Sequence, residues 1–235
     1  MSSTTAAPPD LASAALELID AATELLLSAE FWQLSGRVQA DLLERAEAVG
    51  RRFEYGKLLL LADFHRRDIA GGEAGVSTGQ FLRSRLKISR SEAIRRIHAT
   101  RELVPGVSPS GETLAPELPA TAAAVATGAI SAAHAQVISQ AMRQLPTSLD
   151  TAERVHAEED LAGHARNLDP DDLKIVARRL LLQVNPDGTV PDDKPARREL
   201  TFSRDVDGTD RLRGRLDAEA SATVQAALAP LMTQP

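Results

Sequence analysis

The sequence predicts a mainly α-helical protein: a multi-helix bundle with helix-turn-helix-like pairs and one small β-hairpin near its C-terminal end. Apolar residues make up 43% of the 235 residues and aromatic residues only 3%, and the abundant Ala and Leu favour helices. Apolar side chains also recur at helical spacing along most of the chain. Two alternating segments, 197–204 and 210–217, flank the turn DVDGT, and a closing helix completes residues 197–235.

The first part of the chain, residues 11–104, predicts four helices. Residues 1–10 are small, polar and Pro-containing, so we expect them to be disordered. Helical patterns run over 11–32 and 38–69, and these two helices are expected to pack together. The segment AGGEAG breaks the pattern, and a third helix is expected over 76–86.

The fourth helix has a start signal of its own. Ser89 and Glu92 form the S-x-x-E pattern, in which the serine hydroxyl accepts from the backbone amide of Glu92 and the glutamate reaches back to the cap amide. A helix should therefore begin at Arg90. Residues 105–119 hold four prolines and two glycines, too many for a helix interior, and are expected to form a linker.

Residues 120–184 predict a second helical part. An Ala-rich helix ends at Gly128, and Ser131 caps the next helix, which stops at a proline. A charged amphipathic helix is expected over residues 150–167. Another follows with Asp169 as its N-cap, a proline at its first position and acids in its first turn.

Charge and composition exclude several classes of protein. The net charge of −6 argues against a nucleic-acid coat over the whole surface, so any such binding must come from a local patch. The absence of cysteine excludes disulfides and thiolate zinc sites. The first ten residues carry no positive charge and no apolar stretch typical of a signal peptide. The longest aliphatic run, LLLLA, is too short to span a bilayer, so we expect a cytoplasmic protein with no membrane partner.

The segment from residue 83 to residue 101 carries seven basic side chains against one acid. Lys and Arg that neutralise phosphates provide most non-specific affinity for DNA, and a helix N-terminus favours an anion. The alternative is a solvated helix face, or arginines paired with acids of neighbouring helices. As a helix-turn-helix the segment is atypical, because Arg83 stands where a small residue is usual and Lys87 where glycine is usual. The candidate nucleic-acid-binding residues are Arg83, Arg85, Lys87, Arg90, Ser91, Arg95 and Arg96.

A second helix-turn-helix pattern, GAISAAHAQVI, resembles a stretch of ParB-type partition proteins. Its outward residues, such as Ala132 and Gln136, carry almost no charge, which favours a structural helix pair over a DNA contact, and His134 is expected to form local hydrogen bonds. The other histidines lack metal-ligand spacing; His156 and His164 are expected on a solvated charged helix. DVDGTD imitates a calcium loop, but a hairpin turn is favoured there. We therefore expect no catalytic residue, metal site or cofactor.

Four segments in order, STGQFLRSRLKISRSEAIRRIHATREL, LPATAAAVATGAISAAHAQVI, LDPDDLKIVARRL and RRELTFSRDVDGTDRLRGRLDAEASATVQAAL, resemble the actinobacterial thirteen-E-twelve repeat family. The resemblance covers residues 11–235. That family is a domain of unknown function commonly placed before an HNH endonuclease domain.

The resemblance implies a DNA-associated targeting or accessory module of an HNH-type, mobile-element or prophage-like protein. The HNH domain would follow after Pro235, so the chain resembles an N-terminal module, a truncated product or a fragment, and it is not expected to be catalytic itself, although a full-length parent would resemble an HNH endonuclease. The alternative is a protein-interaction or oligomerisation scaffold without DNA binding, a possible homo-oligomer, with the long N-terminal helices as the interface.

Overall fold

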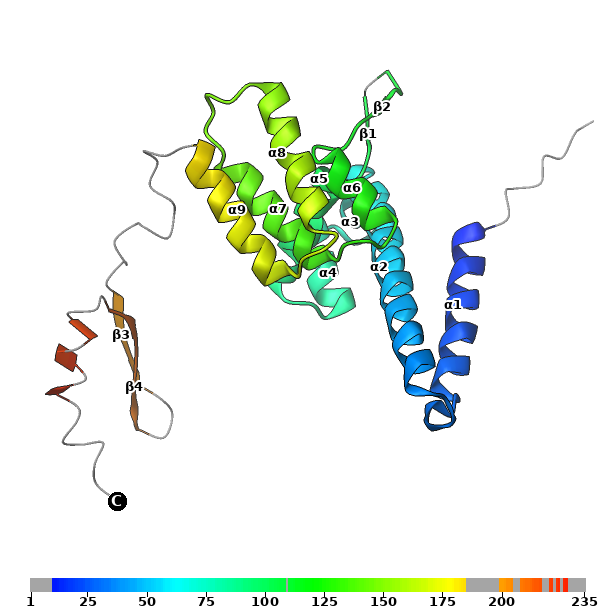
Figure 1. The fold of residues 1–235 in the computed structure, drawn as a ribbon, viewed down its shortest axis with the longest axis horizontal. Coiled ribbons are helices and arrows are strands. Elements are labelled where there is room, and N and C mark those ends of the chain that lie inside the picture. The colour runs from blue at the N-terminus through cyan, green and yellow to red at the C-terminus, as the bar shows by residue number, and fades with distance from the viewer. Residues whose placement is uncertain are drawn as a thin grey trace, which may run out of the picture. The chain divides into compact units, whose positions relative to one another are not determined.

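The computed structural model describes residues 10–108, 110–184, 199–204, 208–216 and part of 220–227. Most of these residues are helical, and the strands form two separate two-stranded antiparallel sheets (Figure 1). The predicted fold class is therefore confirmed. Two compact units make up the chain, residues 1–50 and residues 51–235. The disorder expected for residues 1–10 concerns positions that, apart from Asp10, lie outside the described residues.

The first unit contains helix α1 (Leu11–Leu27), a 3-10 turn (Phe31–Gln33) and the first half of helix α2 (Gly36–Arg66). The Asp10 carboxylate caps α1 by accepting from the backbone amide of Ser13 at 3.1 Å. Hydrogen bonds from the Ser13 hydroxyl and amide lower the pKa of Asp10. One continuous helix was expected up to Trp32, but α1 ends at Leu27 and a corner follows. The Gln39 side chain donates to two backbone carbonyls of this corner, at 2.7 and 3.3 Å.

The second unit begins with the other half of α2, followed by α3 (Ile69–Ala74), α4 (Thr78–Leu86) and α5 (Arg90–Leu103). The segment AGGEAG does not break the helical structure as predicted but forms most of α3. One of its glycines has a steric reason: a Cβ at Gly71 would collide with the carboxylate of Asp68, which precedes the helix. Gly75 then ends α3 in the left-handed conformation, with φ of 62°.

The core of the second unit lies among α6 (Pro119–Ala126), α7 (Ala132–Gln144), α8 (Thr151–His164) and α9 (Pro170–Val184). Helix α7 is central, because it packs against the other three helices. The largest fully buried apolar side chains all belong to this core: Ile130, Ile138, Leu161 and Leu173.

Several polar contacts attach α5 to the rest of this unit. The Tyr55 hydroxyl of α2 donates to the backbone carbonyl of Leu103 at 3.1 Å, and burial raises the pKa of this tyrosine. Glu102 accepts from the Ser139 hydroxyl of α7 at 2.7 Å and also pairs with Arg143. The orientation of α5 is therefore set by neighbours on two sides.

The linker predicted between the two helical parts contains a short β-ladder in which β1 (Gly106–Val107) pairs antiparallel with β2 (Thr113–Leu114). The C-terminal hairpin is confirmed, with β3 (Glu199–Arg204) paired along its whole length with β4 (Asp210–Arg215). The predicted turn DVDGT lies mostly outside the described residues. Those described between 220 and 227 are helical, as expected for a closing helix. In the described part of the chain, no helix combines the length and the apolar character needed to cross a membrane.

Candidate nucleic-acid interface

Helices α4 and α5 form a closely packed pair joined by a three-residue turn, 87–89. Ser77 caps α4, where its hydroxyl accepts from the backbone amide of Gln80 at 3.2 Å. The two helices approach closely, since a Cβ added at Gly79 would lie only 3.7 Å from Ile97 Cδ1. Leu82 and Ala93 are buried on the inner side of the pair. The geometry is therefore that of two short helices around a tight turn, as the sequence predicted.

Lys87 holds the turn in a conformation that favours glycine. It is the C-cap of α4 and has a φ of 56°, in the left-handed region. An L-residue there costs about 1–2 kcal/mol relative to the right-handed conformation. Glycine is the usual residue at this position of a helix-turn-helix. The turn therefore keeps the backbone of such a motif while placing an exposed cation at its tip.

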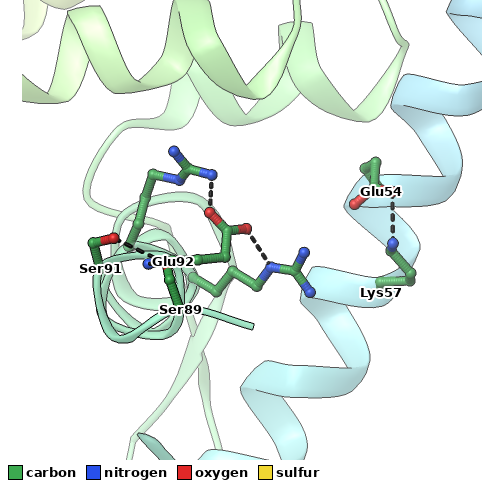
Figure 2. Close-up of polar contacts among 7 residues, drawn as sticks. Glu54, Lys57, Ser89, Ser91 and Glu92 are labelled. Carbon is green, nitrogen blue, oxygen red and sulfur yellow. Dashed lines mark hydrogen bonds and ion pairs between the residues drawn. The ribbon is translucent and has the colours of Figure 1, made fainter. Parts of the chain in front are cut away.

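Three of the basic side chains have acidic partners. The carboxylate of Glu92 pairs with Arg95 and, at 2.7 Å, with Arg96, and Figure 2 shows it between two guanidinium groups. Arg101 pairs with Glu117 at 2.6 Å. These three arginines are ion-paired, but with Glu92 of their own helix and with Glu117 of the linker, and not with acids of neighbouring helices as the alternative expected.

The predicted capping box at Ser89 is half formed. The Ser89 hydroxyl accepts from the backbone amide of Glu92 at 3.1 Å, so Ser89 is the N-cap of α5 as expected. The Glu92 carboxylate, however, turns to the two arginines instead of reaching back to the cap amide. Charge-assisted bonds to two guanidinium groups are stronger than one bond to a neutral amide, which accounts for the difference.

The remaining four cations are different. Each is exposed, and none has an ion-pair or side-chain hydrogen-bond partner among the residues that the structure describes; they are Arg83, Arg85, Lys87 and Arg90, called here the free cations. They occupy the last turn of α4, the turn itself and the first residue of α5. Ser91 is exposed beside them, its hydroxyl 2.9 Å from that of Ser89. The structure thus divides the predicted set into paired and free members.

The other helix pair, α6 and α7, turns at Gly128, which has a φ of 76°. Seven of the thirteen residues of α7 are buried, and no charged residue is exposed in its first two turns. His134 is buried. Its Nδ1 accepts from the backbone amide of Ser131 at 3.2 Å, and its Nε2–H donates to the carbonyl of Leu168 at 2.8 Å. The expectation that His134 forms local hydrogen bonds is confirmed, and this pair belongs to the core.

One buried carboxylate was not predicted from the sequence. Glu158, on the helix expected to be solvated, is only 2% exposed. It accepts from the backbone amides of Ala120 and Thr121 at 3.2 and 2.6 Å, and from the Thr121 hydroxyl at 2.6 Å. The available signal was indirect: α6 begins after Leu118, which cannot cap a helix, so its free amides need an acceptor from elsewhere. Glu158 is therefore a remote cap of α6.

The described residues contain no group of three His, Asp or Glu side chains placed to hold one metal ion. His156 and His164 lie exposed on α8, as predicted for a charged, solvated face. The α4–α5 surface, with its exposed cations, is therefore the candidate site considered below.

Comparison with known proteins gives relatives that are longer than this chain. One uncharacterized protein of Mycobacterium tuberculosis strain H37Rv is 36% identical over 225 residues, which cover 94% of this chain and 49% of that relative. A second uncharacterized protein of the same strain is 35% identical over 211 residues, which cover 88% of this chain and 46% of that relative. An uncharacterized protein of Mycobacterium bovis is 32% identical over 225 residues, which cover 93% of this chain and 48% of that relative. The chain spans about half the length of the curated relatives it matches. No solved structure matches it. The model of the DUF222 family, described as a domain of unknown function, matches residues 40–234, and the chain therefore belongs to this family.

Proposed function

We propose that the chain binds DNA through phosphate contacts made by the free cations of the α4–α5 pair. The observation that carries the proposal is the division of the basic segment, in which four exposed cations around one turn have no partner among the described residues. Had the segment been only a salt-bridged helix face, these side chains would be paired like Arg95 and Arg96.

The positions of the free cations favour an anion as their partner. Arg83 and Arg85 are stabilised by the negative end of the α4 dipole, but Arg90 stands at the positive end of α5, where a cation is unfavourable. Lys87 adds a further positive charge between them. A phosphate placed at the α5 N-terminus would meet three favourable features: the cations, the backbone amides and the Ser91 hydroxyl.

The role in a larger protein is the second half of the proposal. The resemblance to the thirteen-E-twelve family supports a targeting or accessory module of an HNH-type, mobile-element or prophage-like nuclease, with catalysis in a different part of the parent. The length of the relatives agrees with such an arrangement, because this chain covers only 46–49% of the mycobacterial proteins of the H37Rv strain.

Salt dependence of DNA binding tests the phosphate contacts. If all four free cations engage phosphates, log affinity should fall against log salt with a slope of about −3.6, from about −0.9 per contact. Arg90→Ala should flatten this slope by about one unit. Arg101→Ala is the matched control on the same helix, because Arg101 is ion-paired, and it should leave the slope unchanged.

The quadruple variant Arg83→Ala, Arg85→Ala, Lys87→Ala and Arg90→Ala should lose binding at moderate salt while its helical circular dichroism is retained. Equal losses on unrelated sequences indicate phosphate contacts, and unequal losses would instead indicate base reading. A wild-type chain that fails to bind DNA even at low salt contradicts the proposal and leaves the scaffold as the better description.

A further inference from the structure

The first unit presents an apolar surface that the described part of the chain leaves open. Helix α1 has no buried residue, and only Ile19 is half-buried. Leu18 and Leu25 are 71% and 72% exposed. The other exposed leucines of this helix are Leu11, Leu16, Leu26 and Leu27. A helix with this much open apolar surface is stable in water only when another surface covers it, because most helical stability in proteins comes from packing.

The charges of α1 lie on one side. At helical spacing Glu17, Asp20 and Glu24 share a narrow face, and apolar side chains fill the rest of the circumference. The helix carries no basic residue at all, and within the described residues none of the three acids has an ion-pair partner. The covering surface should therefore be apolar and carry basic residues.

The first half of α2 has these properties. Val38, Leu42 and Val49 recur at helical spacing on one face, and Val38 and Val49 are exposed. Arg45 lies on the same face between Leu42 and Val49, and Arg37 and the acidic Asp41 flank its beginning. Neither arginine has an ion-pair partner in the part of the chain that the structure describes.

We propose that the first unit docks on a second copy of this chain, so that α1 of each copy packs on the first half of α2 of the other. Both members of the complementary pair, the acidic helix and the arginine-bearing helix, belong to this one unit, so the surface complements itself as a two-fold interface requires. Trp32, 79% exposed at the corner, is of the residue type most enriched among the residues that dominate binding energy.

Association is measured by light scattering and by the fluorescence of Trp32, the only tryptophan. With rising concentration the mass of the full chain should pass from 25.1 kDa to twice that value, and the emission should shift to shorter wavelength as the indole leaves water. The double variant Leu18→Glu and Leu25→Glu should weaken the dimer by about 100-fold or more. Leu114→Glu, the same change at an exposed leucine of the second unit, is the matched control and should leave it intact.

A mixing experiment identifies the helices in contact. One variant carries Glu17→Lys, Asp20→Lys and Glu24→Lys, and a second carries Arg37→Glu and Arg45→Glu. Each alone should stay monomeric, because like charges face each other in both homodimers. Mixed together they should form a heterodimer, in which every α1–α2 contact joins opposite charges. A contact between α1 and α2 of the same chain predicts no rescue on mixing.

A wild-type chain that stays monomeric at all concentrations, with Trp32 emission already at short wavelength, means that another segment covers this surface and overturns the proposal. Dimers that survive the α1 double variant, or a mixture that stays monomeric, overturn it as well. None of these variants touches the free cations, so the DNA-binding proposal can fail or hold independently.

Discussion

The two helix pairs, α4–α5 and α6–α7, are built alike but have different surroundings. Each joins two helices through a residue in the left-handed conformation, Lys87 in the first and Gly128 in the second, and each second helix starts at a serine cap. In α6–α7 the second helix is enclosed by its neighbours. In α4–α5 the four unpaired cations on and next to the turn are exposed to water. The difference teaches that a shared turn geometry does not determine whether a helix pair is enclosed or exposed; the surroundings of the second helix do.

The largest difference between the two pairs is expected in the loss of stability when an isoleucine of the second helix is shortened. Ile138→Ala on α7 should cost about 2–5 kcal/mol, since this residue is completely buried. Ile94→Ala on α5, where the side chain is 45% exposed, should cost less than about 1 kcal/mol. Chemical denaturation followed by circular dichroism compares the two. Equal losses would show that α5 is as deeply packed as α7, contrary to the comparison.

The second largest difference in stability is expected when the helix caps of the two pairs are removed. Glu158→Gln should cost about 2–3 kcal/mol, because the amide group cannot accept from all the donors around it and leaves buried amides unsatisfied. Ser89→Ala should cost about 1 kcal/mol, the usual effect of losing an exposed N-cap. Denaturation midpoints measure both. A Ser89 variant that loses more than the Glu158 variant would reverse the ranking.

Exchanging the turn residues distinguishes strain from charge. Lys87→Gly should stabilise the fold by about 1 kcal/mol, because glycine accepts the left-handed conformation. The same variant should weaken DNA binding and flatten the salt slope by about one unit. Gly128→Ala should instead destabilise by about 1–2 kcal/mol and leave the slope unchanged. If Lys87→Gly leaves DNA binding intact, Lys87 is not a phosphate contact.

The smallest effect concerns pH. The backbone amides of Asp172 and Asp171 donate to the carboxylate of Asp169, which lowers the pKa of this N-cap of α9 below its usual value of 3.8. Since the folded pKa is the lower one, the stabilisation is present above the unfolded pKa and is lost as pH falls through the folded pKa. Asp169→Ser keeps a cap without titration, as Ser89 does in α5. The free energy of unfolding of this variant, measured by denaturation at a series of acidic pH values, should fall less steeply than that of the wild type. Parallel profiles for the two proteins would show that Asp169 does not contribute to the acid sensitivity.

The sequence predicted what depends on neighbouring residues. Ser89, Ser131 and Asp169 begin helices as expected, because a cap acts on amides two or three residues away. Long-range pairing could not be predicted in the same way. Glu158 finds its donors thirty-seven and thirty-eight residues away in the sequence, so no local pattern distinguishes it from the solvated acids beside it.

The candidate site was predicted as a group and resolved only by the structure. All seven candidate residues lie on α4, its turn and α5, as the sequence placed them. Which of them are unpaired depends on side-chain rotamers, which the sequence does not show. In the structure the Glu92 carboxylate pairs with Arg95 and Arg96, and Arg90 has no ion pair with it. The short α3 was missed because glycines usually signal a break, whereas here one of them makes room for the carboxylate of Asp68.

The exposed position of Lys87 between two helices also bears on where a protease can reach the chain. Of the described lysines, Lys57 and Lys174 lie within helices and hold ion pairs, whereas Lys87 lies exposed at a helix end. A lysine-specific protease needs an accessible bond, and among these three lysines only Lys87 lies outside a regular helix. Cleavage there would separate the basic helix from its partner, and a bound polyanion would shield the bond. The rate of the cut at Lys87 therefore reports, without any label, whether the turn is covered.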